Sequence, residues 1–208
     1  MDVAKFKQQP IMGIMRDVGM DIIDPLVETV IAAGLKTIEI TMNTKNAEQL
    51  IRRAVKKSDG RLTIGAGTVL DLDTLHAALQ AGATFIVMPT LVPEVVQYCV
   101  SNKIPVFPGA LTPQEIFNAW RSGATMVKVF PAKIFGPEYF KELKGPFKNI
   151  ELLACGGVSP ANLKVYIANG ASAVSFGSSV FRSDWLDNRE FPSISRRISQ
   201  YLAALINE

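Results

Sequence analysis

Eight short runs of apolar residues recur along the chain, and a segment with helical periodicity follows each of them. The runs occupy residues 10–16, 37–40, 62–69, 85–88, 105–110, 126–129, 150–156 and 173–176. Near-continuous apolar runs of this length are typical of strands that are buried on both faces of a parallel sheet. Their repeat of about 20 to 25 residues predicts strands that alternate with helices.

Glycines mark the expected ends of four of the helical segments. Each follows Ala, Ser or Asn directly and stands shortly before the next apolar run, at Gly34, Gly82, Gly123 and Gly170. Helices commonly end at a residue with a left-handed backbone, which glycine adopts without steric cost. We therefore expect a positive φ at these four positions.

Eight strand–helix units in one domain predict a closed (β/α)8 barrel of the α/β class. We assign residues 1–208 to this single domain and expect a short N-terminal helix before the first strand. The chain is short for such a barrel, so its loops must be tight. The alternative is an open doubly wound sheet, which is disfavoured because no Gly-x-Gly-x-x-Gly motif follows the first strand.

Composition and charge argue against a nucleic-acid-binding protein and against a membrane protein. The chain is 48% hydrophobic and 20% charged with a net charge of +3, which is ordinary for a soluble globular protein. No run of five like charges occurs, and the basic stretch 52–57 fits one solvated helix face, so neither nucleic acid nor a membrane is an expected partner. No apolar segment has the length of a membrane span.

Two further features favour a cytoplasmic protein. The N-terminus lacks the apolar core and the cleavage site of a signal peptide. The two cysteines, Cys99 and Cys155, lie far apart in the sequence, and Cys99 falls in a helical pattern among apolar residues. A reducing compartment without structural disulfides fits this cysteine usage.

The chain has one histidine, His76. It lies in a segment that Asp71 opens as a helix cap, away from any strand end. A histidine-based metal centre and a Ser-His-Asp triad are therefore not expected, and acid–base chemistry must come from carboxylates, lysines or bound groups. We expect neither a metal nor another cofactor.

A lysine interrupts an otherwise apolar strand. Lys128 stands between Val127 and Val129, and because side chains alternate along a strand, it should point into the barrel while the valines face the helices. Burial lowers the pKa of a lysine, and the neutral amine attacks carbonyl groups. Lys128 is thus a candidate Schiff-base residue; the alternative is a strand-end lysine that reaches water.

Glu39 is a second charged residue on a buried strand. It stands between two isoleucines, so its carboxylate should also face inward, lower the cost of burying Lys128 and serve as a general base. The alternative is a buried ion pair that only fixes packing. Gly65 and Gly67 on the next strand are expected to leave the barrel interior open nearby, unless they only relieve backbone crowding.

Further candidates for binding lie at other strand ends. Arg16 ends the first strand, where a guanidinium can bind a carboxylate or a phosphate bidentately, although an ordinary surface arginine is the alternative. The seventh and eighth strands end in Cys155-Gly156-Gly157 and Gly177-Ser178-Ser179. Glycine-rich turns after these two strands are the usual phosphate site of such a barrel.

Five motifs, taken in order, resemble the 2-keto-3-deoxy-6-phosphogluconate (KDPG) aldolase / 4-hydroxy-2-oxoglutarate aldolase family, and the similarity covers residues 8–182. The motifs are Ile38-Glu39-Ile40-Thr41, Gly65-Ala66-Gly67-Thr68-Val69-Leu70, Phe107-Pro108-Gly109, Lys128-Val129-Phe130-Pro131-Ala132 and Gly156-Gly157-Val158-Ser159-Pro160.

The resemblance implies a class I (Schiff-base) aldolase on a (β/α)8 barrel, a homotrimer that acts in carbohydrate metabolism in the manner of the Entner–Doudoroff pathway. The implied reaction cleaves KDPG, or 4-hydroxy-2-oxoglutarate, to pyruvate and an aldehyde, which is glyceraldehyde 3-phosphate or glyoxylate. Lys128 would form the Schiff base and Glu39 would be the acid–base residue. The other implied positions are Arg16, Asn43, Thr68, Pro89, Phe130 and Cys155 for the substrate, and Gly156, Gly157, Gly177 and Ser178 for its phosphate.

Two positions depart from the gluconate-type pattern. Enzymes of that type commonly have Arg where this chain has Asn43, which has no charge to offer the substrate carboxylate. Galactonate-type relatives also have Asn there, together with an Arg like Arg16. At the position of Cys155, gluconate enzymes usually have Thr and galactonate enzymes an apolar residue. A 2-keto-3-deoxy-6-phosphogalactonate (KDPGal) aldolase is therefore the alternative activity.

Two other function classes remain. A phosphosugar isomerase or epimerase on the same barrel would use Glu39 as a proton shuttle and Lys128 only as an electrostatic clamp. A non-catalytic sugar-phosphate binding protein is disfavoured, because it gives no reason to keep both charges inside the barrel.

Overall fold

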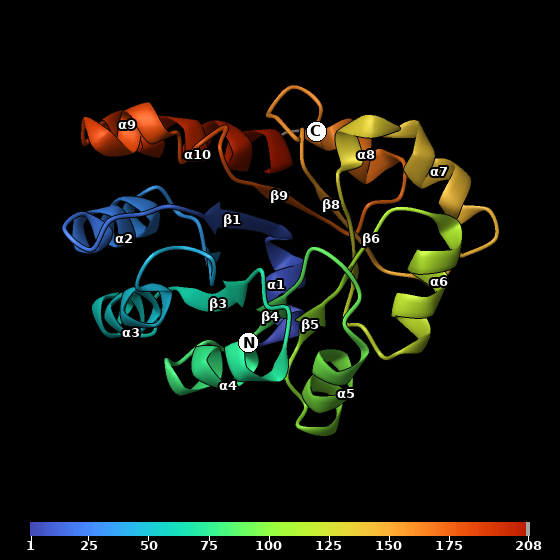
Figure 1. Ribbon diagram of the computed structural model, residues 1–208. Coiled ribbons are helices and arrows are strands. Elements are labelled where there is room, and N and C mark those ends of the chain that lie inside the picture. Colours follow the sequence, from blue (N-terminus) through green and yellow to red (C-terminus); the bar gives the residue numbers. More distant parts are fainter. Residues whose placement is uncertain (207–208) are drawn as a thin grey trace.

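Strands and helices alternate along the chain in the computed structural model, which describes residues 1–206 (Figure 1). A helical segment follows each strand except β5, which is followed directly by β6. The first half contains α1 (Val3–Gln8), β1 (Ile11–Met15), α2 (Ile23–Ala32), β2 (Thr37–Thr41), α3 (Ala47–Ser58), β3 (Thr63–Gly67), α4 (Leu72–Gln80), β4 (Ile86–Val87) and α5 (Pro93–Ser101). The second half contains β5 (Val106–Phe107), β6 (Gly109–Ala110), α6 (Pro113–Arg121), β7 (Val127–Val129), the 3-10 helix η1 (Ala132–Ile134), α7 (Glu138–Lys144), β8 (Leu152–Cys155), α8 (Leu163–Ala168), β9 (Ala173–Phe176), α9 (Ser183–Asp187) and α10 (Phe191–Ile206).

All the strand pairs are parallel, and the strands run in the order β5-β4-β3-β2-β1-β9-β8-β7-β6. β5 and β6 are the two halves of the predicted strand 105–110, which is interrupted at Pro108 because proline has no N–H to donate. The Pro108 carbonyl still accepts a hydrogen bond of 2.9 Å from the Lys128 backbone N–H. Since β5 pairs with β4 and β6 pairs with β7, this one segment closes the ring. The prediction of a (β/α)8 barrel is confirmed.

The strand side chains divide between two apolar layers. Ile38, Ile40, Val127 and Val129 are buried in the large cluster between strands and helices, as the alternation predicts. A smaller cluster fills the inside of the barrel and consists of Phe6, Met12, Phe85, Val87, Phe107, Met126, Leu153 and Ala173.

The N-terminal helix α1 closes one end of the barrel, and Figure 1 shows it within the ring of strands. The Asp2 carboxylate caps this helix by accepting a hydrogen bond from the Lys5 backbone N–H. Phe6 then packs edge-on against Phe107, with 6.1 Å between the ring centroids, and Phe107 packs in the same manner against Phe85. These rings occupy the amino-terminal end of the barrel, so the site must lie at the carboxyl ends of the strands.

The glycines behave as predicted at the helix ends but not in β3. Gly34, Gly82, Gly123 and Gly170 have φ values of 91°, 102°, 96° and 102°, which confirms the left-handed helix ends. The prediction that the two β3 glycines, Gly65 and Gly67, leave open space is wrong. A Cβ at Gly65 would lie 2.4 Å from the Phe85 ring, and a Cβ at Gly67 would lie 2.6 Å from a Glu39 carboxylate oxygen. These two side chains fill the space that the glycines provide.

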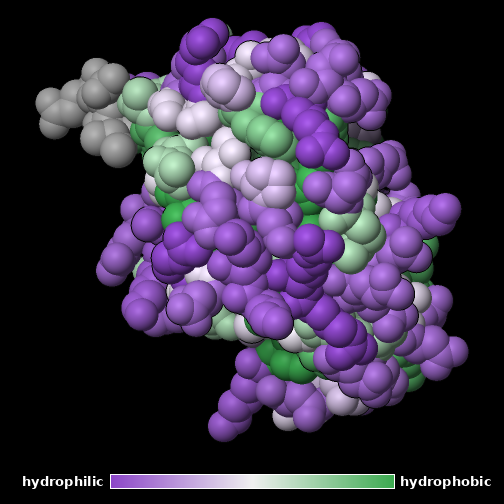
Figure 2. Space-filling view, turned by 90° about the vertical axis from the view of Figure 1, so that its left-hand side faces the viewer, coloured by the Kyte–Doolittle hydropathy of each residue, from purple (hydrophilic) through white to green (hydrophobic). Residues whose placement is uncertain are grey.

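The basic stretch 52–57 lies on α3 and is paired with acidic groups of α2. Arg53 contacts Asp24 at 2.7 Å and Lys57 contacts Glu28 at 3.3 Å, with all four side chains partly exposed. Figure 2 shows that this side of the molecule is mainly hydrophilic. Among residues 1–206, no helix combines the length and the apolar character that a membrane crossing requires.

Candidate active site

A cavity of about 860 Å³ lies at the carboxyl ends of the strands. Every residue that the sequence proposes for the site lines this cavity except Glu39 and Asn43: the lining includes Arg16, Thr68, Pro89, Lys128, Phe130, Cys155, Gly156, Gly157, Gly177 and Ser178. Glu39 lies just behind the lining, in contact with Lys128. Asn43 is exposed on the turn after β2 and is not part of the lining.

Lys128 and Glu39 form an ion pair across the barrel interior. The Lys128 Nζ lies 3.9 Å from the Glu39 Oε1, and only 9% and 1% of the two side chains are exposed. Gly67 supplies the room for the carboxylate, since any larger residue would place a Cβ against it. The other carboxylate oxygen, Oε2, is buried and has no hydrogen-bond partner among the described residues. The Glu39 carboxylate is thus free to accept a proton or a hydrogen bond.

Burial shifts the proton affinity of Glu39. Desolvation raises the pKa of its carboxyl group above the ordinary value of 4.5, and the nearby charges of Lys128 and Arg16 oppose this rise only in part. A carboxylate with a raised pKa is a stronger base than an exposed glutamate, which suits proton transfer near neutral pH.

The expected lowering of the Lys128 pKa is wrong. Burial is the largest influence on this ammonium and lowers its pKa, but the neighbouring Cys155 and Glu39 side chains favour the charged form and together raise the pKa above 10.5. Lys128 therefore rests as an ammonium and must lose a proton before it can attack a carbonyl carbon. Glu39 is the carboxylate beside it.

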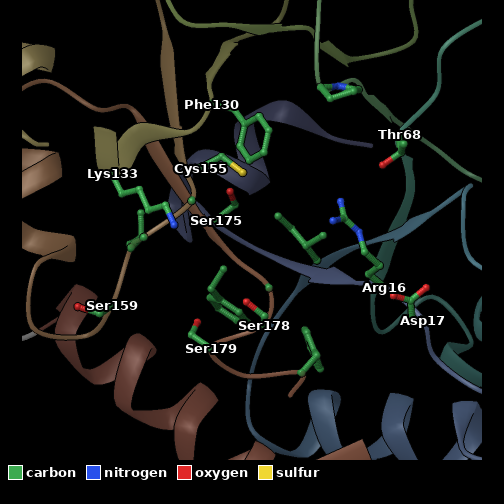
Figure 3. A pocket seen from close by; sticks show the side chains of 18 of the residues that line it. Arg16, Asp17, Thr68, Phe130, Lys133, Cys155, Ser159, Ser175, Ser178 and Ser179 are labelled. Carbon is green, nitrogen blue, oxygen red and sulfur yellow. The ribbon is translucent and has the colours of Figure 1, made fainter. Parts of the chain in front are cut away.

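The wall around Lys128 combines apolar and weakly polar groups. The Lys128 Nζ lies 5.5 Å from the centre of the Phe130 ring, which is 37% exposed and lines the cavity. Cys155 on β8 and Ser175 on β9 are adjacent in the sheet register, and both are buried while lining the cavity. Figure 3 shows Cys155 and Ser175 side by side on this wall. The Ser175 hydroxyl donates only a long hydrogen bond of 3.3 Å to the Ala154 carbonyl, so it remains available to a ligand.

Arg16 and Thr68 lie on the opposite side of the cavity (Figure 3). Arg16 follows β1, and none of the described carboxylates forms an ion pair with it. Its neighbour Asp17 donates a backbone hydrogen bond of 3.1 Å to the Thr44 hydroxyl, which ties the end of β1 to the turn after β2. Thr68 has a φ of 58°, an uncommon and strained conformation for a β-branched residue.

The two glycine-rich turns are held together by the C-terminal helix. The Tyr201 hydroxyl of α10 donates a hydrogen bond of 2.7 Å to the Val158 carbonyl and lies 2.8 Å from the Ser179 hydroxyl. The Asn162 side chain closes the first turn by accepting from the Ser159 N–H at 2.7 Å and donating to the Gly157 carbonyl at 3.0 Å. The turns are therefore fixed before any ligand binds.

Sequence reasoning missed five polar or charged residues of the cavity lining, which are Asp17, Lys133, Ser175, Ser183 and Asp187. Strand alternation could have found Ser175, because it is two residues from the inward Ala173. No sequence signal identifies Lys133, which lies after β7 in the 3-10 helix η1. Within residues 1–206, no three of the His, Cys, Asp and Glu side chains cluster closely enough to hold a metal ion.

Comparisons with known proteins agree with this geometry. A family model described as "Aldolase: KDPG and KHG aldolase" matches residues 3–197. The 2-dehydro-3-deoxy-6-phosphogalactonate aldolase of Escherichia coli K12 is 36% identical over 175 residues, which are 84% of this chain and 85% of that protein. The 2-dehydro-3-deoxy-phosphogluconate aldolase of Pseudomonas aeruginosa is 39% identical over 160 residues, which are 76% of this chain and 71% of that protein.

The fold of this chain also matches that of a solved structure. A solved structure titled "Native KDPGal structure" superposes with a TM-score of 0.88 at 32% identity and covers 94% of both chains. The family model spans most of the chain, and both relatives exceed 30% identity over more than two thirds of it. The chain therefore belongs to the family of KDPG and KHG aldolases, which are lyases.

Proposed function

We propose that this protein is a class I aldolase that cleaves a 2-keto-3-deoxy-6-phospho sugar acid to pyruvate and glyceraldehyde 3-phosphate. The observation that carries the proposal is the inward lysine on β7, which has a buried carboxylate 3.9 Å away and the cavity in front of it. A lysine so placed can form a Schiff base with a ketone, and the carboxylate can move the protons that the reaction requires.

The first half of the reaction forms an iminium. Glu39 accepts a proton from the resting Lys128 ammonium, which its raised pKa favours. The neutral amine attacks the C2 ketone of the substrate to give a carbinolamine. Glu39 then returns its proton to the carbinolamine hydroxyl, which leaves as water to give the iminium, and the Glu39 carboxylate is restored. The iminium then accepts the electron pair of the breaking bond, which is the task that a metal performs in other aldolases.

The second half breaks the carbon–carbon bond and restores the lysine. Glu39, directly or through a water molecule, takes the C4 hydroxyl proton, and the C3–C4 bond breaks to give an aldehyde and an enamine on Lys128. Glu39 then gives this proton to C3 of the enamine, which produces the pyruvate iminium and restores the carboxylate. Hydrolysis then releases pyruvate and regenerates the amine.

The two ends of the substrate fit different parts of the cavity. Arg16 lies on the side of Thr68 and can bind the substrate carboxylate (Figure 3). The turns at Gly156-Gly157 and Gly177-Ser178 offer backbone N–H groups and a hydroxyl to the phosphate. Pro89, Phe130 and Cys155 are proposed to enclose the reacting carbons between these ends.

A second candidate substrate is the galactonate epimer, and the placement of Asn43 favours it. Asn43 is exposed and outside the cavity lining, and Lys133 lies on the side of the cavity opposite Arg16, so Arg16 is the cation beside Thr68 that can bind the carboxylate. This is the arrangement expected of galactonate-type relatives, and a KDPGal aldolase is among the similar proteins. 4-Hydroxy-2-oxoglutarate would undergo the same steps without using the glycine-rich turns.

The proposal is tested by supplying the purified protein with each epimer and with 4-hydroxy-2-oxoglutarate and measuring pyruvate release. We expect cleavage of at least one phosphorylated epimer and no cleavage after Lys128→Met. The matched control is Lys141→Met, an exposed lysine on α7 outside the cavity lining. Cleavage by Lys128→Met at the wild-type rate would disprove the proposal.

The homotrimer and the cytoplasmic location rest on the family resemblance and on the cysteine usage. Both Cys99 and Cys155 are buried free thiols, which suits a reducing compartment. Light scattering in solution measures the mass directly: three times 22.7 kDa supports the trimer. A monomer or a dimer would rule it out.

A further inference from the structure

Three cationic side chains line the cavity within the described residues, and the proposed reaction uses only two of them. Lys128 forms the Schiff base and Arg16 binds the carboxylate, whereas Lys133 has no assigned role. Figure 3 shows Lys133 on the side of the cavity opposite Arg16, with its side chain extending toward the cavity from beside the first glycine-rich turn.

The backbone around Lys133 is joined to that turn. The Lys133 N–H donates a hydrogen bond of 3.0 Å to the Gly156 carbonyl. A Cβ at Gly157 would lie 2.4 Å from the Lys133 Cβ, so the turn can pack this closely only because residue 157 is glycine. The backbone of Lys133 is therefore held against the turn, and its side chain starts beside the N–H groups that the turn presents.

The charge of this lysine is free for a ligand. No carboxylate in the described part of the chain lies within ion-pair distance of it, whereas the exposed cations Arg53 and Arg61 are paired. The other groups at this end of the cavity are the glycine N–H groups and the hydroxyls of Ser159, Ser178 and Ser179, which are neutral. Asp187 also lines the cavity and would repel an anion.

A phosphate monoester carries a charge of about −1.5 to −2 at pH 7. Neutral donors alone leave that charge unbalanced, and the Asp187 carboxylate adds to the imbalance. We propose that Lys133 binds the terminal phosphate of the aldehyde half of the substrate and thereby sets the preference for phosphorylated over unphosphorylated aldehydes. This inference rests on the proposed function and adds to it the residue that selects the phosphate.

The test uses the condensation direction, with pyruvate saturating and the aldehyde varied. For Lys133→Gln we expect the KM for glyceraldehyde 3-phosphate to rise roughly 10- to 100-fold, since a charge-assisted hydrogen bond is lost. The KM for glyoxylate should stay within about twofold of the wild type, because glyoxylate has no phosphate. Lys133→Arg should restore much of the affinity, and Lys141→Gln, the control on α7, should change neither constant.

A second readout does not depend on catalysis. Calorimetric titration with inorganic phosphate should show binding to the wild type that weakens with added salt and that Lys133→Gln reduces by a similar factor. Unchanged phosphate binding and unchanged KM for glyceraldehyde 3-phosphate would overturn the inference. Equal rises in KM for both aldehydes would show a structural role instead, and a rise in the KM for pyruvate would place Lys133 at the carboxylate.

These outcomes are distinct from failure of the proposed function. If the protein forms no covalent adduct with pyruvate, the aldolase mechanism fails, yet phosphate binding that depends on Lys133 would still support a phosphate site here. If the adduct forms and Lys133→Gln leaves phosphate binding unchanged, the mechanism stands and this inference is wrong.

Discussion

Glu39 is 1% exposed and carries the proton transfers of the proposed mechanism. Glu39→Gln keeps the shape and the hydrogen-bonding capacity of the side chain but cannot accept a proton. We expect kcat for cleavage to fall by about 10²- to 10⁴-fold, the usual loss for a positioned general base. Borohydride should still trap pyruvate on Lys128 in this variant, but more slowly, because Lys128 must then lose its proton without Glu39. Near-normal turnover would show that Glu39 is only structural.

The pH dependence of kcat/KM tests the same residue, because kcat/KM reports the pKa values of the free enzyme. A general base must be deprotonated, so kcat/KM should fall as the pH drops through the pKa of Glu39. Because burial raises that pKa, the acid-side midpoint should lie above the ordinary 4.5. In Glu39→Gln this acid limb should be absent from the residual rate. A wild-type profile that is flat down to pH 4.5 would contradict the assignment.

Arg16 and Asn43 offer a matched comparison at the carboxylate end. Arg16→Ala removes a charge that lines the cavity and should cost about 1.5–3 kcal/mol of substrate binding. We therefore expect a higher KM for pyruvate when the condensation reaction is measured. Asn43→Ala should leave that KM nearly unchanged, since Asn43 lies outside the lining. The reverse result would assign the carboxylate to Asn43.

Strand alternation alone predicted that Lys128 and Glu39 point inward. Their apolar neighbours on each strand face the helices, and successive side chains point to opposite faces. Strand alternation could not predict the raised pKa of Lys128. That shift depends on Cys155 and Glu39, which come from other strands and meet Lys128 only in the folded barrel. Lys133 escaped prediction for the same reason, since its place in the lining follows from its contact with Gly157.

At the scale of elements, β3 tests how tightly the barrel interior is filled. Gly65→Ala would force its Cβ against the Phe85 ring, so we expect the free energy of unfolding to fall by about 1–3 kcal/mol, as for overpacked cores. Denaturant titration measures this change. The control is Gly145→Ala at the end of α7, where the residue is exposed and φ is −54°, and it should stay within about 0.5 kcal/mol of the wild type. Equal stability of the two variants would mean that β3 is loosely packed.

Most helix ends could be read from the sequence because their signals are local. Asp71 caps α4 as predicted, and its carboxylate accepts the Thr74 N–H at 2.7 Å. The break of the predicted strand 105–110 was less apparent, although Pro108 is its cause. Its two halves pair with different neighbours, and that division depends on closure of the whole ring.

At the scale of the molecule, the barrel brings together groups that are far apart in the sequence. β2 supplies the carboxylate, β7 the amine, and β8 and β9 the turns, while α1 closes the other end of the barrel. The eightfold repeat predicted this gathering, since alternate strand residues of a closed barrel point to one axis. The repeat could not predict which inward residues reach the cavity, because that depends on the side chains that fill the layer beneath them.

The group that accepts the electron pair of the breaking bond can also be tested on the whole protein. If the Lys128 iminium accepts the electrons, treatment with EDTA should leave the cleavage rate unchanged. A loss that a divalent cation restores would indicate a metal-dependent aldolase instead.

The central claim is that Lys128 forms a covalent bond with pyruvate. The most direct test is to add borohydride with pyruvate, measure the remaining activity and locate the label by peptide mass spectrometry. The account predicts inactivation that requires pyruvate, one three-carbon adduct on the peptide that contains Lys128, and no adduct in Lys128→Met. An adduct on Lys133 or Lys144, or activity that survives the treatment without an adduct, would contradict it.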